Sequence, residues 1–352
     1  MIVKAVQPRV HVLGLGSIGT FAAHSLAEVP PPLTPSVTLL LHRASLVDQY
    51  VRNGSQITLE TREGEIVNHG NYNLEVLQDD QWHSASSTCH DPTPNGNMTV
   101  QDDIIDHLVV SVKGPQTSSA LQPLKHRLNA SSHILFLQNG TGMIEDVKKH
   151  VFTKEETRPN FITGVISHGQ HLWGWCLRGE QISKAIPRTK PYLLEALALV
   201  PRFNATSYSF LEVFQIQLEK LAVNAFCNPL CALNDAKNKF LFTIPETRRA
   251  LLTEISQVVC ALPELRDIPG VPDRFSVERL ETTVDGIIQK TAETTCSMVV
   301  DLRRGQKTEI QFINGYWCRR GREVGVPTPI NDKLVREILE RQGDARLALD
   351  YT

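Results

Sequence analysis

Strand-like and helix-like segments alternate along the first two hundred residues, and this alternation limits the possible folds more than any other feature. The apolar runs are RVHVLGLG, VTLLLHR, IDHLVVSVK, HILFLQNG and NFITGVISHG, and helical segments such as SIGTFAAHSLAEV, TSSALQPLKHRL and GMIEDVKKHVF lie between them. This order is typical of strand–helix–strand units, in which helices cover a mostly parallel sheet. The sequence therefore predicts an α/β Rossmann-type N-terminal domain with a mostly parallel sheet.

The pattern changes in the second part of the chain, where five segments have helical periodicity. Breaks that contain proline and glycine, such as PELRDIPGVPD and GVPTP, separate them. We therefore predict two domains, a dinucleotide-binding domain at residues 1–207 and an all-α substrate and catalytic domain at residues 208–352. Within the first domain, residues 56–75 are expected to form a hairpin around Gly64, and the polar residues 79–103 a surface loop.

The bulk composition argues against several classes of partner. The chain has 352 residues, a formal net charge of −2 and no long basic or acidic block, so neither nucleic acid nor a membrane is an expected partner. No apolar stretch approaches the roughly 18 residues of a membrane span. The seven cysteines are scattered and never form a C-x-x-C pair, so no disulfide framework and no metal site is expected. No secretory signal is evident, and the expected compartment is the cytoplasm, with the mitochondrion left open.

A glycine-rich loop joins the first predicted strand to the first predicted helix. Gly14, Gly16 and Gly19 in GLGSIG have the spacing G-x-G-x-x-G, which lets a pyrophosphate approach backbone N–H groups at the helix N-terminus. Because a strand precedes the loop and a helix and a second strand follow it, we predict a dinucleotide site that includes Ser17 and Ile18. A plain glycine turn is the alternative.

The ends of three predicted strands bear on the cofactor. Arg43 stands where an NAD-dependent enzyme carries an acidic residue for the ribose 2′-hydroxyl. A basic residue at this position favours a 2′-phosphate, so the sequence predicts NADP(H); the alternative is that Arg43 is a solvated strand end. Lys113 and Gln116 in SVKGPQ, and Asn139 in LQNGTG, follow two further strands. They are therefore predicted at the carboxyl edge of the sheet, where ligands bind.

Three polar residues interrupt an otherwise apolar helical segment in the second domain. In EKLAVNAFCNPL, Lys220, Asn224 and Asn228 recur every four residues and share one face of a helix. Pro229 removes a helical donor and would leave the carbonyl of Ala225 without its usual partner, so a local break of the helix at Asn228 is predicted. We interpret the stripe as facing a cleft between the domains where cofactor and substrate meet. The alternative is a half-buried helix with a snorkelling lysine.

These motifs resemble those of a known family. The pattern K-x-x-x-N-x-x-x-N-P-L that begins at Lys220, together with SMVVDLRRGQKTEIQFINGY, GLGSIG, VKGPQ and QNGTG in the same order, is similar to the ketopantoate reductases (2-dehydropantoate 2-reductases). The motifs span residues 12–315, and the two carboxyl-terminal ones are specific. The resemblance implies an oxidoreductase acting on CH–OH groups, which reduces 2-dehydropantoate to (R)-pantoate with NADPH in pantothenate and coenzyme A synthesis.

The resemblance also implies roles for single residues. Lys220 corresponds to the general acid that protonates the ketone oxygen as hydride arrives, and Glu309 matches its acidic partner. Arg43 is placed like the contact to the 2′-phosphate, and Lys113 and Asn139 match positions near the nicotinamide and the substrate. The implied substrate-binding residues are Asn224, Asn228, Asn238 and Ser297. The expected partner is a small-molecule 2-keto acid, bound by a monomer or a homodimer.

The chain also departs from the family pattern. The family often has N-x-S-S-M where this chain has TTCSM, so Thr294 replaces a substrate-side asparagine. The family's glycine-rich hairpin is hard to find after His168, and residues 79–103 look like an insertion. Reduction of another 2-keto acid therefore stays an alternative. A further alternative is a catalytically inactive NADPH sensor, against which the presence of both Lys220 and Glu309 counts.

Overall fold

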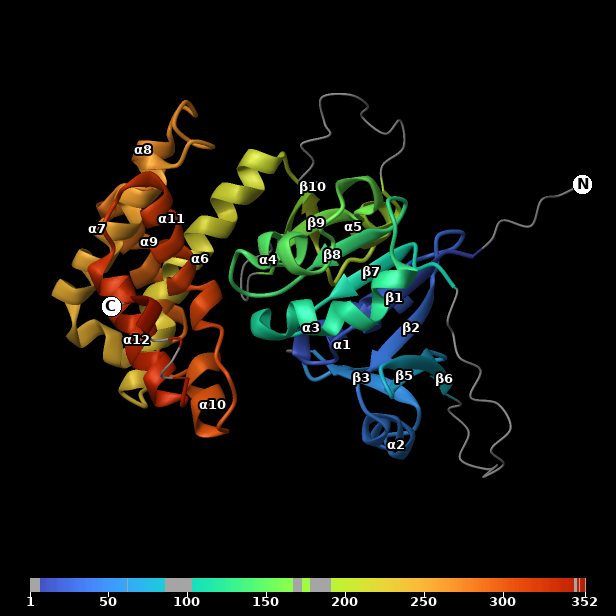
Figure 1. The fold of residues 1–352 in the computed structure, drawn as a ribbon. Coiled ribbons are helices and arrows are strands. Elements are labelled where there is room, and N and C mark those ends of the chain that lie inside the picture. The colour runs from blue at the N-terminus through green and yellow to red at the C-terminus, as the bar shows by residue number, and fades with distance from the viewer. Residues whose placement is uncertain are drawn as a thin grey trace, which may run out of the picture. The chain divides into compact units, whose positions relative to one another are not determined.

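The computed structural model describes residues 7–61, 63–85, 103–166, 173–177, 191–344, 347 and 349–351. The chain divides into two compact units (Figure 1). Unit 1 consists of Met1–Gln138 and Ile144–Val213, and unit 2 of Asn139–Met143 and Phe214–Thr352. A parallel-dominated sheet with helices precedes a helical region, which confirms the predicted fold class.

Unit 1 is built on a sheet with nine strands among the described residues, in the order β11-β10-β9-β8-β7-β1-β2-β5-β6. Six neighbouring strands run parallel, namely β1 (Arg9–Leu13), β2 (Ser36–Leu41), β5 (Asn73–Gln78), β7 (His107–Val110), β8 (His133–Phe136) and β9 (Asn160–Val165). At the edges, β6 (Gln81–Ala85) is antiparallel to β5, β10 (Trp173–Leu177) is antiparallel to β9, and β11 (Ala205–Ser207) pairs with β10. Because β1 lies between β2 and β7, the strand order reverses there, and the carboxyl ends of these strands form a switch point at which ligands bind.

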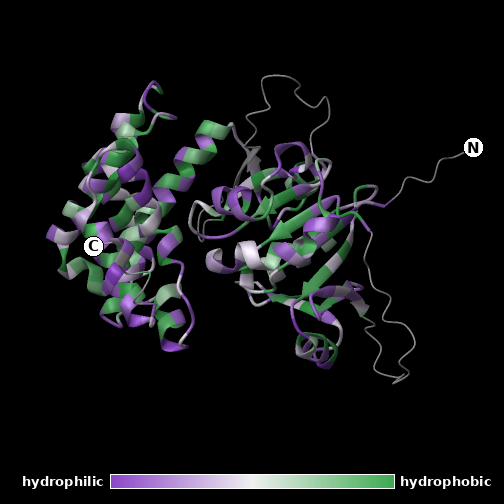
Figure 2. Cartoon of the chain, viewed as in Figure 1, coloured by the Kyte–Doolittle hydropathy of each residue, from purple (hydrophilic) through white to green (hydrophobic). Residues whose placement is uncertain are grey.

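The parallel strands are buried on both faces, which explains why they appear in the sequence as continuous apolar runs. In register across the sheet, Val12, Leu39 and Val109 belong to one core, and their neighbours Leu13 and Leu40 belong to the other. The strands are accordingly among the most hydrophobic parts of unit 1 (Figure 2). Residues of α1 (Ser17–Ala27) and α5 (Tyr192–Ala198) complete the first core, and residues of α3 (Thr117–Leu121), η2 (Gln122–Arg127) and α4 (Met143–His150) complete the second.

A separate two-stranded sheet follows α2 (Ala44–Arg52). It consists of β3 (Gln56–Glu60) and β4 (Ile66–Gly70), which confirms the predicted hairpin for residues 56–70. The last residues of the predicted range, 73–75, belong instead to β5 of the large sheet, where they pair with β2. The surface loop predicted at residues 79–103 is partly wrong, because residues 81–85 form the edge strand β6. The physical reason is Trp82, whose side chain is buried in the second core and holds the polar residues around it against the sheet. Residues 86–102 lie outside the described residues.

Among the described residues of unit 2, the regular elements are all helices. Its α-helices are α6 (Phe210–Leu233), α7 (Pro245–Ala261), α8 (Val271–Arg274), α9 (Val277–Lys290), α10 (Ser297–Arg303), α11 (Asn314–Val324) and α12 (Pro329–Arg341), joined by the short 3-10 turns η5 (Asn238–Thr243) and η6 (Ile310–Phe312). Helix α7 packs against α9, α11 and α12. Among the helices of the described residues, none combines the length and the apolar character that crossing a membrane requires.

Candidate active site

The glycine-rich loop lies between the end of β1 and the start of α1. Gly14 has a φ of +94°, and a Cβ there would lie 2.6 Å from the backbone nitrogen of Val112. A Cβ on Gly19 would overlap the carbonyl oxygen of Gly14 and the hydroxyl of Ser111. Only glycine therefore permits the tight turn and the close contact of α1 with the ends of β1 and β7.

Gly16 has the opposite environment. It is exposed, and a Cβ built on it would meet no heavy atom of the described chain within 4 Å beyond its immediate neighbours. Gly16 is also the N-cap of α1, and no side chain caps this helix. An open approach to backbone N–H groups that lack a side-chain cap suits a phosphate group. The loop, with Ser17 and Ile18 in the first turn, therefore fits the pyrophosphate of a dinucleotide.

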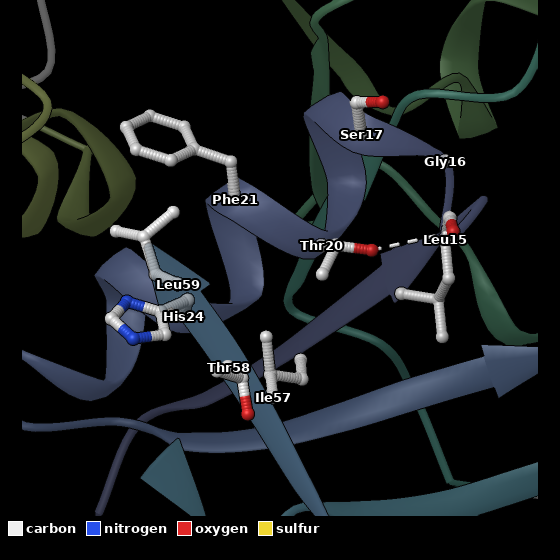
Figure 3. A pocket seen from close by; sticks show the side chains of 9 residues that line it. All are labelled: Leu15, Gly16, Ser17, Thr20, Phe21, His24, Ile57, Thr58 and Leu59. Carbon is white, nitrogen blue, oxygen red and sulfur yellow. Dashed lines mark hydrogen bonds between the residues drawn. The ribbon is translucent and has the colours of Figure 1, made fainter. Parts of the chain in front are cut away.

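A pocket of about 320 Å³ adjoins this loop (Figure 3). Its lining comes from α1 with the loop before it and from β3, and consists of Leu15, Gly16, Ser17, Thr20, Phe21, His24, Ile57, Thr58 and Leu59. The size and the mixture of apolar side chains with a few hydroxyls are typical of small-molecule sites. The sequence did not indicate that the β3–β4 hairpin contributes a wall, because the contact joins segments about 40 residues apart.

The other predicted cofactor residues of unit 1 follow β2 and β7. Arg43 is exposed and is the N-cap of α2, two residues beyond the end of β2. Lys113 is half-buried and Gln116 is exposed in η1 (Gly114–Gln116), which follows β7. All three therefore lie beyond the carboxyl ends of strands that flank β1, as the switch-point rule expects of nucleotide contacts.

Lys220 lies on α6 in unit 2, and its ammonium has a specific partner. Nζ donates a hydrogen bond of 2.8 Å to Oδ1 of Asn139. The sequence grouped Asn139 with the sheet edge, but the structure holds it in unit 2. There the backbone N–H of Thr141 donates to the carbonyl of Phe312 at 2.8 Å, and Gly140, at a φ of +86°, lies against the same residue. Residues 139–143 are thus anchored beside η6, whose N-cap is Glu309.

Burial and one carboxylate set the acidity of Lys220. Burial lowers the pKa of Lys220 to about 8, and the negative charge of Glu309, itself buried, partly opposes this by raising it. A lysine with this pKa is mostly protonated at neutral pH and releases its proton more readily than an exposed lysine does. Lys220 therefore has a pKa suited to a general acid, and the negative charge of Glu309 helps to keep its amine protonated.

The predicted substrate-binding residues all lie in unit 2. Asn224 is half-buried and Asn228 is buried, and both follow Lys220 on α6 at intervals of four residues, as expected. Asn238 is buried at the start of η5, and its Nδ2 donates to the hydroxyl of Thr291 at 2.9 Å. Ser297 is exposed as the first residue of α10. The four side chains thus come from three elements of one unit.

Two backbone contacts tie these elements together. The thiol of Cys296 donates to the carbonyl of Asn228 at a distance of 3.7 Å. The backbone N–H of Asn238 donates to the carbonyl of Thr294 at 3.1 Å. Residues 294–298, which differ from the family pattern, therefore contact Asn228 and Asn238 directly.

The predicted break of the helix at Asn228 is wrong, because α6 continues without interruption to Leu233 with Pro229 inside it. Proline lacks the N–H that would bond to the carbonyl of Ala225. That carbonyl accepts a hydrogen bond of 2.9 Å from Nδ2 of Asn314 instead. A side chain from α11 thus replaces the missing main-chain donor, and the helix stays whole.

Asn314 belongs to a buried polar network that ends at a carboxylate. Its Nδ2 also donates to Oδ1 of Asn331 at 3.0 Å, and Nδ2 of Asn331 donates to Oε2 of Glu254 at 2.8 Å. Burial raises the pKa of Glu254, although hydrogen bonds from Ile330 and Asn331 oppose this in part. We did not predict a role for Asn314, but two signals were available: an asparagine in the apolar stretch FINGYW, and a proline within a helical pattern.

Two family models match the chain. "Ketopantoate reductase PanE/ApbA" matches residues 10–176, and "Ketopantoate reductase PanE/ApbA C terminal" matches residues 212–342. A probable 2-dehydropantoate 2-reductase of Schizosaccharomyces pombe is 26% identical, covering 95% of this chain and 96% of the relative. A 2-dehydropantoate 2-reductase of Yersinia pestis is 31% identical over 71% of this chain and 80% of the relative. Ketoisovalerate reductase BEA2 of Gibberella fujikuroi is 23% identical, covering 88% of this chain and 77% of the relative.

Several solved structures share the fold, among them the following two. The ternary structure of D-mandelate dehydrogenase with NADH and anilino(oxo)acetate matches with a TM-score of 0.69 and 17% identity, covering 96% of this chain and 99% of that chain. A PanE/ApbA family ketopantoate reductase from Ralstonia eutropha JMP134 matches with a TM-score of 0.67 and 20% identity, covering 96% of this chain and 99% of that chain. At these identities the likeness concerns the fold, a sheet domain followed by a helical one.

Proposed function

The chain belongs to the ketopantoate reductase family and is an oxidoreductase that acts on CH–OH groups with a nicotinamide cofactor, and on this premise we propose that it reduces 2-dehydropantoate to (R)-pantoate with NADPH. The observation that carries the proposal is the ammonium of Lys220. It is bonded to Asn139, and its pKa is lowered to about 8 by burial and partly raised again by Glu309. We place this reaction in pantothenate and coenzyme A synthesis in the cytoplasm.

The proposed chemistry requires an acid at the ketone oxygen. When bound, the nicotinamide supplies a hydride to the carbonyl carbon, and negative charge develops on the oxygen. Lys220 stabilises this charge and then transfers a proton from Nζ to the oxygen, which yields the alcohol. Asn139 orients the ammonium, and Glu309 keeps it protonated at neutral pH by raising its pKa. Solvent returns the proton to the amine after product release.

The substrate is proposed to bind through uncharged groups. The carboxamides of Asn224, Asn228 and Asn238 and the hydroxyl of Ser297 hydrogen-bond to the hydroxyl and carboxylate of the keto acid. Carboxamides hold these groups without adding a charge that would compete with the ammonium for the developing oxyanion. The burial of Asn228 supports this assignment, because a buried amide requires partners. The amide of Asn238 already donates to Thr291, so its place beside Asn228 and Ser297 rests on the resemblance to the family.

NADPH is the proposed form of the cofactor. The uncapped N-terminus of α1 and the open space at Gly16 receive the pyrophosphate. The exposed guanidinium of Arg43, just beyond the end of β2, pairs with the 2′-phosphate, for which arginine has suitable geometry. Lys113 and Gln116 complete the contacts beyond β7. Hydride transfer further requires that these residues of unit 1 and the substrate residues of unit 2 meet around one cofactor.

A second candidate function is the reduction of another 2-keto acid. The observation that favours it is Thr294, which stands where the family often has a substrate-side asparagine and whose carbonyl bonds to the backbone of Asn238. BEA2 is named a ketoisovalerate reductase, so a relative with a different keto acid exists. A sensor without catalysis is the weaker alternative, because the lowered pKa of Lys220 serves no purpose in a protein that only binds NADPH.

The decisive experiment follows the absorbance of NADPH in the presence of 2-dehydropantoate, 2-ketoisovalerate or phenylglyoxylate. We expect turnover with 2-dehydropantoate, a preference for NADPH over NADH, and a decrease of about 10²–10⁴-fold in kcat/KM for Lys220→Ala. Lys237→Ala is the matched control, because Lys237 lies in the same unit but is exposed and pairs with Glu293.

The other outcomes separate the alternatives. Turnover with a different keto acid only, shifted toward 2-dehydropantoate by Thr294→Asn, would support the second candidate. Binding of NADPH without turnover of any substrate would contradict the catalytic proposal. Equal loss of activity in Lys220→Ala and Lys237→Ala would show that Lys220 is not the acid.

A further inference from the structure

Three potential metal ligands lie together in unit 1, apart from the residues of the proposed reaction. His24 is on α1, Glu28 is the C-cap of the same helix, and His69 is on β4 of the hairpin. Nδ1 of His24 is 3.9 Å from Oε1 of Glu28, and Nε2 of His69 is 3.6 Å from the same oxygen. The three ligand atoms lie within 4.8 Å of one another. A helix and a hairpin thus bring two imidazoles and one carboxylate to one point.

The hydrogen bond of His24 determines which ring nitrogen faces this cluster. Nε2 lies 3.1 Å from the carbonyl oxygen of Val67, which can only accept, so Nε2 carries the proton and the neutral ring has its lone pair on Nδ1. Burial lowers the pKa of His24 and so favours this neutral form. His24 is fully buried, and its Nδ1 has no hydrogen-bond partner among the described residues. A ring that donates to a carbonyl through one nitrogen and offers the other is the usual arrangement of a metal-binding histidine.

The second imidazole also offers a ring nitrogen to the cluster. Nε2 of His69 also lacks a hydrogen-bond partner within the described part of the chain. The rings of His24 and His69 meet edge to face, with centroids 4.5 Å apart and an interplanar angle of 69°. Two imidazole nitrogens and a carboxylate oxygen therefore face one another, and a cation or a proton between them would relieve their repulsion.

Arg202 already bonds to the Glu28 oxygen that lies nearest the two imidazoles. Its Nε donates to Oε1 of Glu28 at 2.8 Å. A carboxylate has about four lone-pair sites, so this bond leaves others for a second cation. Hydrogen-bonded carboxylates are common in metal sites, where the outer bond orients the ligand.

We propose that Nδ1 of His24, Nε2 of His69 and the carboxylate of Glu28 bind a divalent cation of the zinc type. Two imidazoles and a carboxylate, with a water as the fourth ligand, are a common ligand set for Zn²⁺. With metal–ligand bonds of about 2.0–2.2 Å, the ligands of a tetrahedral ion are about 3.4 Å apart. The two distances to Glu28, 3.6 Å and 3.9 Å, therefore require shifts of a few tenths of an ångström. The two imidazole nitrogens lie within 4.8 Å of each other and must approach by up to about 1.4 Å, which the partly exposed His69 side chain can provide. Mg²⁺ and Ca²⁺ are poor candidates because they prefer oxygen ligands.

The ion joins the hairpin to the helix that begins at the glycine-rich loop. His24 also lines the pocket beside this loop, and β3 forms part of the same pocket (Figure 3). A metal bound between α1 and β4 therefore fixes the position of the pocket wall. This role is structural and does not depend on the reaction proposed for Lys220.

The test is titration of metal-free protein with Zn²⁺ by calorimetry and with Co²⁺ by absorption spectroscopy. We expect one equivalent to bind and to raise the Tm, and His69→Gln to weaken this binding at least about 100-fold, since loss of a group that merely orients a ligand costs 10–100-fold. His69 is partly exposed on a hairpin, so the variant is expected to fold, as circular dichroism will show. His150→Gln is the matched control, because His150 is exposed and pairs with Asp146 at 3.0 Å on one helix.

Binding by thiols must be separated from binding at this cluster, because the chain has seven cysteines. Cobalt bound by two imidazoles and a carboxylate shows visible bands without the intense near-ultraviolet charge transfer of a thiolate ligand. Retention of these visible bands in His150→Gln and their loss in His69→Gln would support the proposal. Equal affinities of the wild type and His69→Gln, thiolate bands in the cobalt spectrum, or the absence of saturable Zn²⁺ binding would overturn it.

Discussion

At the scale of single residues, Lys220 illustrates how two opposing effects set the strength of an acid. Burial removes water from the ammonium and lowers its pKa to about 8, while the carboxylate of Glu309 raises it in part. Below this pH the amine holds its proton, and above it the neutral amine predominates. The bond to Asn139 adds orientation without adding charge.

A pH profile tests this balance. We predict that kcat/KM for keto-acid reduction falls about tenfold per pH unit above roughly pH 8, because the neutral amine of Lys220 has no proton to donate. Glu309→Gln removes the charge that raises the pKa, so the falling limb moves to lower pH. Initial rates across a pH series at low substrate concentration will measure the falling limb in the wild type and in Glu309→Gln. A limb that stays in place in the variant would assign the titration to another group.

At the scale of elements, α6 depends on a side chain from outside the helix. Asn314→Ala leaves the carbonyl of Ala225 buried without a donor, which costs about 1–3 kcal/mol in the free energy of unfolding. Pro229→Ala restores the main-chain donor, so Asn314→Ala should cost less in that background. Urea denaturation of the wild type, both single variants and the double variant measures this coupling. Equal costs in both backgrounds would contradict the compensation.

A buried ion pair joins β5 to η2 in unit 1. Arg127 contacts both oxygens of Glu75, at 2.6 Å and 3.2 Å, and both side chains are buried. Burial alone would raise the pKa of Glu75, but hydrogen bonds from His11 and Arg127 and the charge of Arg127 lower it to about 2. Because the folded pKa is below the ordinary value of 4.5, the pair stabilises the fold above pH 4.5, and this contribution is lost as the pH falls toward 2.

Glu75→Gln should reveal this contribution. The variant leaves the guanidinium of Arg127 buried without its anion, so we predict a loss of about 3–5 kcal/mol at neutral pH. The difference from the wild type should shrink as the pH falls from 4.5 toward 2, because the wild-type carboxyl then becomes neutral as well. Denaturant titrations at several pH values will measure it. A difference that does not change with pH would mean that packing, rather than charge, causes the loss.

At the scale of the whole molecule, the predicted residues divide between the two units. The glycine-rich loop, Arg43, Lys113 and Gln116 lie in unit 1, whereas Lys220, Glu309, the asparagines and Ser297 lie in unit 2. Cofactor binding and proton transfer should therefore respond to different substitutions.

Fluorescence titration with NADPH tests this division. Gly16→Ala places a methyl group in open space, so we predict unchanged Tm but weaker NADPH binding, because the methyl group obstructs the pyrophosphate. Gly19→Ala is the contrasting variant and should lower the Tm, since its Cβ meets the carbonyl of Gly14. Lys220→Ala should bind NADPH almost normally while losing turnover. Normal NADPH affinity in Gly16→Ala would argue against a pyrophosphate at this loop.

The features determined by the sequence alone are those that depend on near neighbours in the chain. The apolar runs predicted the parallel strands, and the GLGSIG segment was placed as a loop between the first strand and the first helix. Intervals of four residues placed Lys220, Asn224 and Asn228 on one helix face. Each follows from the geometry of a single strand, turn or helix. The site assignments themselves remain predictions that the experiments above will test.

Only the tertiary structure decided which distant groups become partners. Asn314 keeps α6 intact across Pro229, Asn139 bonds to Lys220 in unit 2, and Trp82 turns part of a polar stretch into a strand. The cluster of His24, Glu28 and His69 was likewise not predicted, because its histidines lie on different elements and form no short motif. A hydrogen bond or metal ligand requires atoms within a few ångströms, and packing, rather than spacing in the sequence, brings such atoms together.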